Sequence, residues 1–132
     1  MEQPRVTRTE ILNHPTLAPM LKMQLYAVFT KPSNGLAPVL EMLEKHLAYQ
    51  VDLEQRGIMF GAGPFFAENE EDWEGAGMVI VRAGSLAEAK AIAAADPMHA
   101  SGARSFTVRP WLLDEGTLTI KVTYSDGRRQ IL

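Results

Sequence analysis

Apolar positions along the chain follow two different periods. Four stretches rich in β-branched and aromatic residues predict strands: "MQLYAVFT" (23–30), "IMFGAGPFF" (58–66), "AGMVIVRA" (76–83) and "ARSFTVRPWLL" (103–113). After the first strand, apolar residues recur at helical spacing between residues 36 and 51. An alanine-rich helix follows the third strand over residues 85–96, with Ser85 as its N-cap and Glu88 completing a capping box. The predicted order is therefore β-α-β-β-α-β.

This order indicates an α+β fold of the ferredoxin-like, split βαβ type. Both helices are expected on one face of an antiparallel sheet, which leaves the other face for a second copy and predicts a homodimer. The tail "GTLTIKVTYSDGRRQIL" predicts a C-terminal β extension that turns at Asp126–Gly127. Residues 1–21 are polar and contain prolines, so they predict an N-terminal arm before a single domain at 22–132.

Composition excludes several classes of function. The formal net charge is −3, so no basic surface favours nucleic acid. The absence of cysteine excludes disulfides, thiolate catalysis and cysteine-ligated zinc. His14, His46 and His99 form no metal-ligand spacing with an acid, so no metal is expected. No apolar run is long enough for a bilayer, and a cytoplasmic protein with no membrane partner is the expectation.

The segment "AIAAADPMHASGARSF" (91–106) raises a question about Asp96. The alanine-rich helix is expected to end there, where the helix dipole disfavours a carboxylate. His46 lies on the apolar stripe of the first helix and needs a hydrogen-bond partner. The two helices of a split βαβ fold lie side by side, so Asp96 can reach His46. Such a pair is either a catalytic acid–base dyad or a buried structural contact.

Two longer segments carry a family resemblance. "EKHLAYQVDLEQRGIMFGAGPF" and "GAGMVIVRAGSLAEAKAIAAADPMHASGARSFTVRPW" resemble the YCII-related family, over about residues 23–115. The resemblance implies a dimeric α+β barrel with a cleft that holds a His–Asp pair. His46 and Asp96 match those two family positions. At least one relative looks like a dehydrochlorinase of a chlorinated hydroxyhydroquinone.

The expected function is acid–base chemistry on a small cyclic or aromatic substrate, with His46 and Asp96 as the catalytic pair. Elimination such as dehydrochlorination, isomerisation and lactone hydrolysis all suit such a pair, and none needs a cofactor. The alternative is a non-catalytic small-molecule-binding or structural dimeric module. The sequence does not identify the substrate.

Further residues are candidates for contacting the substrate. His99 follows Asp96 in an expected loop. Arg104 and Arg109 lie on opposite faces of one strand, so only one can face the cleft, and Arg104 is the candidate. Gly63 and Pro64 present a bare backbone edge that could seat a ligand or shape a strand bulge.

Two tryptophans complete the candidate set. Trp111 could stack on an aromatic ligand, or serve in interior or interface packing. Trp73, in the acidic loop "AENEEDWEG", could serve as a lid residue or belong to the ordinary loop surface, and the surface is the expectation.

Overall fold

The computed structural model describes residues 3–132, and Met1 and Glu2 lie outside the described residues. The chain divides into two units. One unit is Gln24–Leu112, and the other comprises the flanking segments Met1–Met23 and Leu113–Leu132. The expected arm at 1–21 falls in the flanking unit, as does the C-terminal tail that was expected to belong to the domain.

The flanking segments contain short elements. Helix α1 (Arg8–Asn13) is capped by Thr7, whose side chain accepts a bond from the Glu10 N–H, and a 3-10 turn follows at Pro15–Leu17. Strands β5 (Ile120–Val122) and β6 (Arg129–Ile131) form an antiparallel hairpin. The hairpin turns at Asp126–Gly127, where Gly127 has a φ of +69° that favours glycine. This is the β extension that the sequence predicted.

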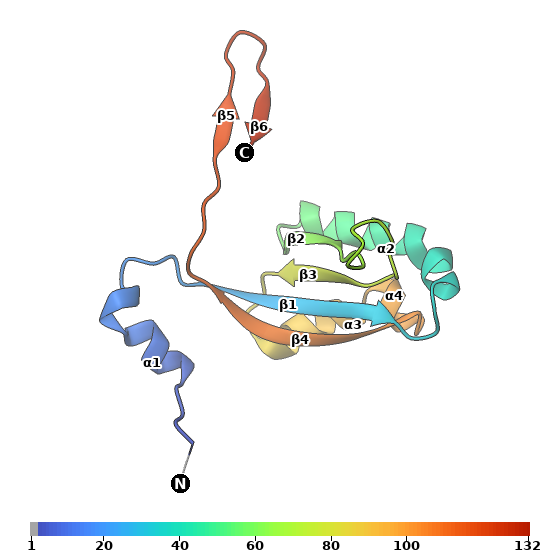
Figure 1. The fold of residues 1–132 in the computed structure, drawn as a ribbon, viewed down its shortest axis with the longest axis horizontal. Helices are drawn as coiled ribbons and strands as arrows, with labels where there is room; N and C mark the ends of the chain where they lie inside the picture. The colour runs from blue at the N-terminus through green and yellow to red at the C-terminus, as the bar shows by residue number, and fades with distance from the viewer. Residues whose placement is uncertain (1–2) are drawn as a thin grey trace. The chain divides into compact units, whose positions relative to one another are not determined.

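The main unit contains a four-stranded antiparallel sheet in the order β2-β3-β1-β4 (Figure 1). Its elements are β1 (Met23–Pro32), α2 (Ala37–Gln55), β2 (Met59–Pro64), β3 (Gly77–Val81), α3 (Leu86–Ala94), α4 (Pro97–Ala100) and β4 (Arg104–Leu113). The α+β, ferredoxin-like prediction is confirmed. The structure adds α4, a four-residue helix that the sequence analysis treated as loop.

Local chemistry explains where the two long helices begin and end. Pro38 lies in the first turn of α2, where its missing N–H costs no helical bond. The chain leaves α2 through Gly57, whose φ of +73° suits glycine. Ser85 caps α3 by accepting the Glu88 N–H, and the Glu88 carboxylate accepts the Gly84 N–H at 2.8 Å. The predicted capping residues therefore start α3.

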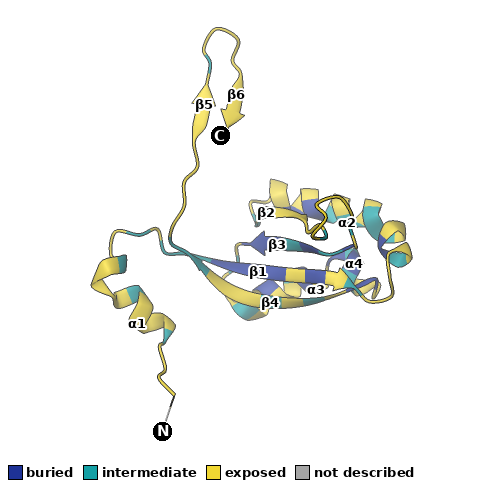
Figure 2. Ribbon diagram, viewed as in Figure 1, coloured by how far each residue is buried: buried dark blue, intermediate teal, exposed yellow. Residues whose placement is uncertain are grey.

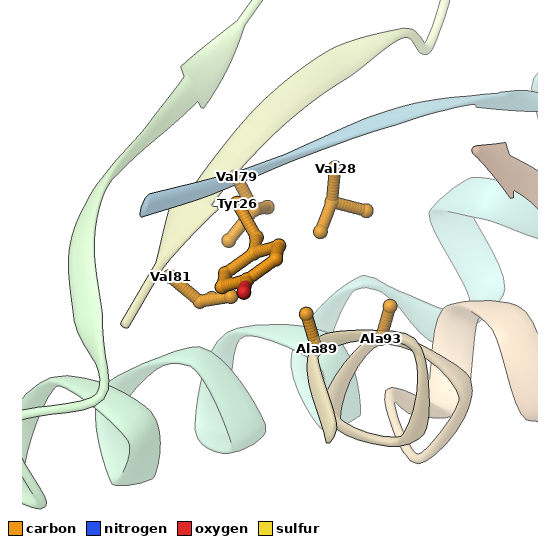
Figure 3. Close-up of a cluster of buried hydrophobic side chains, with 6 residues drawn as sticks. All are labelled: Tyr26, Val28, Val79, Val81, Ala89 and Ala93. Atoms are coloured by element: carbon orange, nitrogen blue, oxygen red, sulfur yellow. The ribbon is translucent and has the colours of Figure 1, made fainter. Parts of the chain in front are cut away.

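The core lies between the sheet and α3. The antiparallel register pairs Tyr26 with Val81 and Val28 with Val79, which places these side chains on one face. Figure 3 shows them directed at the small side chains of α3 (Ala89 and Ala93), and all of these residues are buried. Two alanines at the contact let the helix backbone lie close to the sheet.

The opposite face of the sheet has no helix of the main unit on it (Figure 1). The register pairs Ala27 with Ile80 and Phe29 with Met78 on that face. Phe29 is 40% exposed. Figure 2 shows the central strands β1 and β3 largely buried, whereas β2 and β4 are more exposed.

The close helix–sheet contact makes a stability prediction. Ala89→Leu should lower the free energy of unfolding by about 1–3 kcal/mol, because the added carbons have no free volume beneath α3. Ala91→Leu on the exposed side of the same helix should change it by less than about 0.5 kcal/mol. Urea denaturation measures both. Equal effects of the two substitutions would contradict this packing.

Candidate functional site

Asp96 begins a helix rather than ending one, which corrects the expectation from the sequence. Helix α3 ends at Ala94, and Asp96 is the N-cap of α4. Its Oδ1 accepts a hydrogen bond from the Met98 N–H at 2.9 Å. A carboxylate is a preferred residue at this position, so the local backbone favours the acid.

The same carboxylate contacts His46 on α2. His46 Nδ1 lies 2.7 Å from Asp96 Oδ2 and 3.0 Å from Oδ1. The side chains are 12% and 4% exposed, respectively. Gln50, one turn after His46, donates from Nε2 to Asp96 Oδ2 at 3.2 Å. The two residues that the sequence paired are thus in direct contact in a largely buried site.

Asp96 stays ionised in this setting. Burial raises the pKa of its carboxyl group, but the hydrogen bonds from His46 and from the Met98 N–H outweigh burial and hold the pKa below its usual value. An ionised carboxylate accepts from His46 Nδ1 and so keeps a proton on that nitrogen. His46 Nε2 has no hydrogen-bond partner among the described residues, and it remains available for proton exchange.

A cavity of about 600 Å³ opens beside His46. It lies between α2, strands β2 and β3 and the loop that joins those strands, and its volume suits a small organic molecule. Most of its lining is apolar. Its polar lining residues are Thr30, His46, Gln50, Glu54 and Arg104.

The apolar stripe of α2 forms one wall of this cavity. An apolar stripe at helical spacing is typical of a buried helix face, yet Leu47 is 53% and Val51 is 48% exposed. Both residues line the cavity together with Leu43. The helical periodicity was therefore correct, but part of the stripe serves the cavity instead of the core.

Three of the substrate-contact candidates line this cavity: Gly63, Pro64 and Arg104. Trp111 does not line it and is 41% exposed. Arg104 lines the cavity from the start of β4, so Trp111, an odd number of residues further along that strand, belongs to its opposite face.

His99 also lies outside the cavity lining, in α4 rather than in a loop. Its Nδ1 donates to the Ala93 carbonyl and its Nε2 contacts Thr30 Oγ1, both at 2.7 Å. Its ring packs on Phe106 with a centroid distance of 4.4 Å. Both ring nitrogens are thus engaged within the fold.

Sequence reasoning missed three residues of the site. Gln50 lies four residues after His46 on the same helix face, a spacing that could have revealed it. Thr30 alternates in phase with the inward-facing Tyr26 and Val28 on β1. Trp73, expected at the loop surface, is instead partly buried in the cavity wall, with its indole N–H bonded to the Ala76 carbonyl at 2.9 Å. No local pattern predicts that loop conformation.

The model of the YCII-related domain matches residues 23–112. The chain belongs to the YCII-related family. This YCII-related domain contains the whole cavity lining and the His46–Asp96 contact. The resemblance seen in the sequence is thereby confirmed.

A solved structure shares the fold of the YCII-related domain. It is 5-chloro-2-hydroxyhydroquinone dehydrochlorinase (TftG) from Burkholderia phenoliruptrix AC1100, in complex with 2,5-dihydroxybenzoquinone. The TM-score is 0.51 at 18% sequence identity, and the alignment covers 66% of this chain and 92% of that one. Among curated proteins, none matches this chain by sequence.

The described residues contain neither a membrane-spanning helix nor a metal cluster. No helix in residues 3–132 is long and apolar enough to cross a membrane. Within the same residues, no group of three or more His, Asp or Glu side chains is arranged to hold a metal ion.

The buried imidazole of His99 predicts how stability depends on pH. Burial lowers the pKa of His99 in the native state, outweighing the Ala93 hydrogen bond and the Asp96 charge, which raise it. As the pH falls below about 6.5, His99 becomes protonated in the unfolded chain before it does in the native chain. The free energy of unfolding therefore decreases as the pH decreases. His99→Gln should remove this contribution, which is at most about 1.4 kcal/mol per pH unit.

Urea denaturation between about pH 7 and pH 5 measures that slope in both proteins. The lowered pKa of Asp96 acts at more acidic pH: its stabilisation is present above about pH 4 and is lost as the pH falls through the native value. A wild-type slope that survives unchanged in His99→Gln would contradict the assignment to His99.

Proposed function

We propose that this protein is an enzyme that moves protons on a small ring-shaped organic substrate, with His46 as the general acid–base. The observation that carries the proposal is the contact between His46 Nδ1 and the ionised Asp96 at the wall of a cavity of about 600 Å³. Asp96 fixes the tautomer, orients the ring and balances the charge of the imidazolium when it forms. His46 Nε2 then exchanges the proton.

An elimination illustrates the reaction class. His46 Nε2 accepts a proton from a hydroxyl or C–H group of the substrate, and the electron pair left behind forms a double bond as a leaving group departs with its own pair. The imidazolium later returns its proton to water or to the leaving group. Protons and electrons balance without an oxidant. Isomerisation uses the same group twice, first as base and then as acid.

The likeness to TftG supports this class of reaction. That protein is named a dehydrochlorinase and is seen with a planar dihydroxybenzoquinone. Gly63 and Pro64 line the cavity here, and Gly63 has no side chain to obstruct a ring. At 18% identity the likeness establishes the fold alone, so experiment has to identify the substrate of this chain. The cytoplasmic location, the lack of a cofactor and the lack of a nucleic-acid partner stay predictions.

His46→Gln tests the mechanism. Glutamine can still donate to Asp96 and so should preserve the fold, but it cannot accept and return a proton. Turnover should fall about a hundredfold or more. The assay is steady-state kinetics on chlorinated hydroquinones, lactones and related cyclic acids. His14→Gln is the matched control, because His14 lies in the flanking unit and bonds to the Thr16 N–H.

Asp96→Asn separates orientation from folding. The amide oxygen can keep the bond from the Met98 N–H, which turns the amide nitrogen toward His46 Nδ1. Two donors then face each other, so the neutral imidazole carries its proton on Nε2 instead of Nδ1. Nε2 can then no longer accept a proton from the substrate. Turnover that survives in both variants would refute the mechanism. No turnover on any substrate, together with ligand binding in calorimetry, would favour the binding module.

We also propose that the protein is a homodimer that covers the open face of the sheet. Phe29 and Trp111 belong to that face and are 40% and 41% exposed, respectively. Large apolar side chains gathered on one sheet face favour burial against another surface. A second copy offers a matching face through a two-fold axis.

Sedimentation tests the dimer. The wild-type protein should sediment as a dimer at micromolar concentration, and Phe29→Glu should shift it to monomer because two buried carboxylates would face the same interface. Tyr124→Glu is the control, since Tyr124 is 97% exposed in the hairpin outside the YCII-related domain. A wild-type monomer, or a Phe29→Glu dimer as stable as the wild type, would contradict this arrangement.

A further inference from the structure

Arg104 is a buried cation without an anion. The residue is 6% exposed at the start of β4 and lines the cavity. Its Nε is buried and has no hydrogen-bond partner among residues 3–132. The ion pairs among residues 3–132 join His46 to Asp96, Arg56 to Asp52 and Arg128 to Asp126, so none includes Arg104. Burying a guanidinium costs free energy that an ion pair normally offsets.

The guanidinium is held by an aromatic ring. Arg104 Cζ lies 5.7 Å from the ring centroid of Trp73. The indole N–H of Trp73 donates to the Ala76 carbonyl, which fixes the ring in the cavity wall. Among the described residues, no protein acceptor bonds to the guanidinium N–H groups. A planar fork of free donors suits a carboxylate or a phenolate oxygen.

Asp96, whose charge acts on Arg104, does not form an ion pair with it. Asp96 influences Arg104 through its charge but accepts hydrogen bonds from His46, Gln50 and the Met98 N–H. Glu54 also lines the cavity, without an ion pair to Arg104. Because Arg104 lines the cavity, a molecule bound there can supply the anion that the described residues do not.

Thr30 adds a directional polar contact. His99 Nδ1 donates to the Ala93 carbonyl, and burial lowers the pKa of His99, so the ring is neutral and its Nε2 accepts. The Thr30 hydroxyl must then donate to His99 Nε2. Its oxygen has lone pairs left, and Thr30 lines the cavity. Toward a bound molecule, this hydroxyl acts as an acceptor.

We propose that the cavity selects small ring compounds that carry an anionic oxygen, held by Arg104, and a hydroxyl group that donates to Thr30. This deepens the proposed function by naming its substrate class: phenolates and hydroxylated aromatic or cyclic carboxylates. The anionic oxygen of the substrate binds the Arg104 guanidinium, and the proton is exchanged at His46 Nε2. Binding and proton transfer are carried by different residues, so they can be tested separately.

Matched ligands of equal shape test the charge preference. Probe pairs are 4-hydroxybenzoate with 4-hydroxybenzamide, and 2,5-dihydroxybenzoate with 2,5-dihydroxybenzamide. Binding is followed by calorimetry and by the NMR signal of the Arg104 Nε–H, which is assigned by its absence in Arg104→Met. The carboxylates should bind about tenfold or more tightly than the amides, the gain expected of a charge-assisted hydrogen bond. They should also shift the Arg104 signal.

Arg104→Met should abolish this preference without lowering Tm, because the variant removes a buried charge that has no carboxylate partner among the described residues. Arg109→Gln, in the same strand and exposed, should leave the preference unchanged. Thr30→Val should weaken the binding of hydroxylated ligands but not the binding of unsubstituted benzoate. Equal binding of acid and amide, or no response of the Arg104 signal to any carboxylate at millimolar concentration, would overturn the proposal.

The two proposals fail in different ways. If anion preference is absent but turnover still depends on His46, the substrate class is wrong and the acid–base mechanism stands. If Arg104 selects anions and His46→Gln binds them as the wild type does, the anion site is supported whether or not a turnover assay succeeds.

Discussion

The carboxylate of Asp96 is the point on which the site depends. It caps α4 through the Met98 N–H, it accepts from His46 of α2, and it follows directly after α3. One side chain that is 4% exposed therefore joins α2 to α4, close to the end of α3. Removing one member of such a buried pair typically costs about 3–5 kcal/mol, because the other is left without compensation. The geometry of the imidazole and the path of the backbone are consequently fixed by the same group.

This arrangement explains how a buried acid remains useful for chemistry. Burial alone would raise the pKa of Asp96 and favour its neutral form, but two hydrogen bonds reverse that effect. The ionised acid then determines which nitrogen of His46 carries the proton. Gln50 contributes a third bond. Its own Oε1 is buried and has no hydrogen-bond partner in the described part of the chain, which costs stability beside the dyad.

The sequence predicted those features that depend on local pattern and strand parity. The order of strands and long helices followed from the two hydrophobic periods, and alternation along β4 separated Arg104 from Arg109. The helix that Asp96 begins was missed, because four residues carry no periodic signal and an Asp-Pro step marks both a helix end and a helix start. The position of Trp73 depends on the whole β2–β3 loop and on its contact with Arg104, which lies far away in the sequence.

A second, smaller core joins the two halves of the site. Asp96 and Arg104 stand at the two ends of one short segment, which runs through α4 and a turn at Gly102, where φ is +81°. Met98 and Ala103 from this segment are buried against Val39 of α2, with Trp73 packed at the edge. Burying a side chain such as Met98 contributes about 1.5–3 kcal/mol. Because α2 also carries His46, this core fixes the spacing between the imidazole that exchanges the proton and the guanidinium proposed to bind the anion.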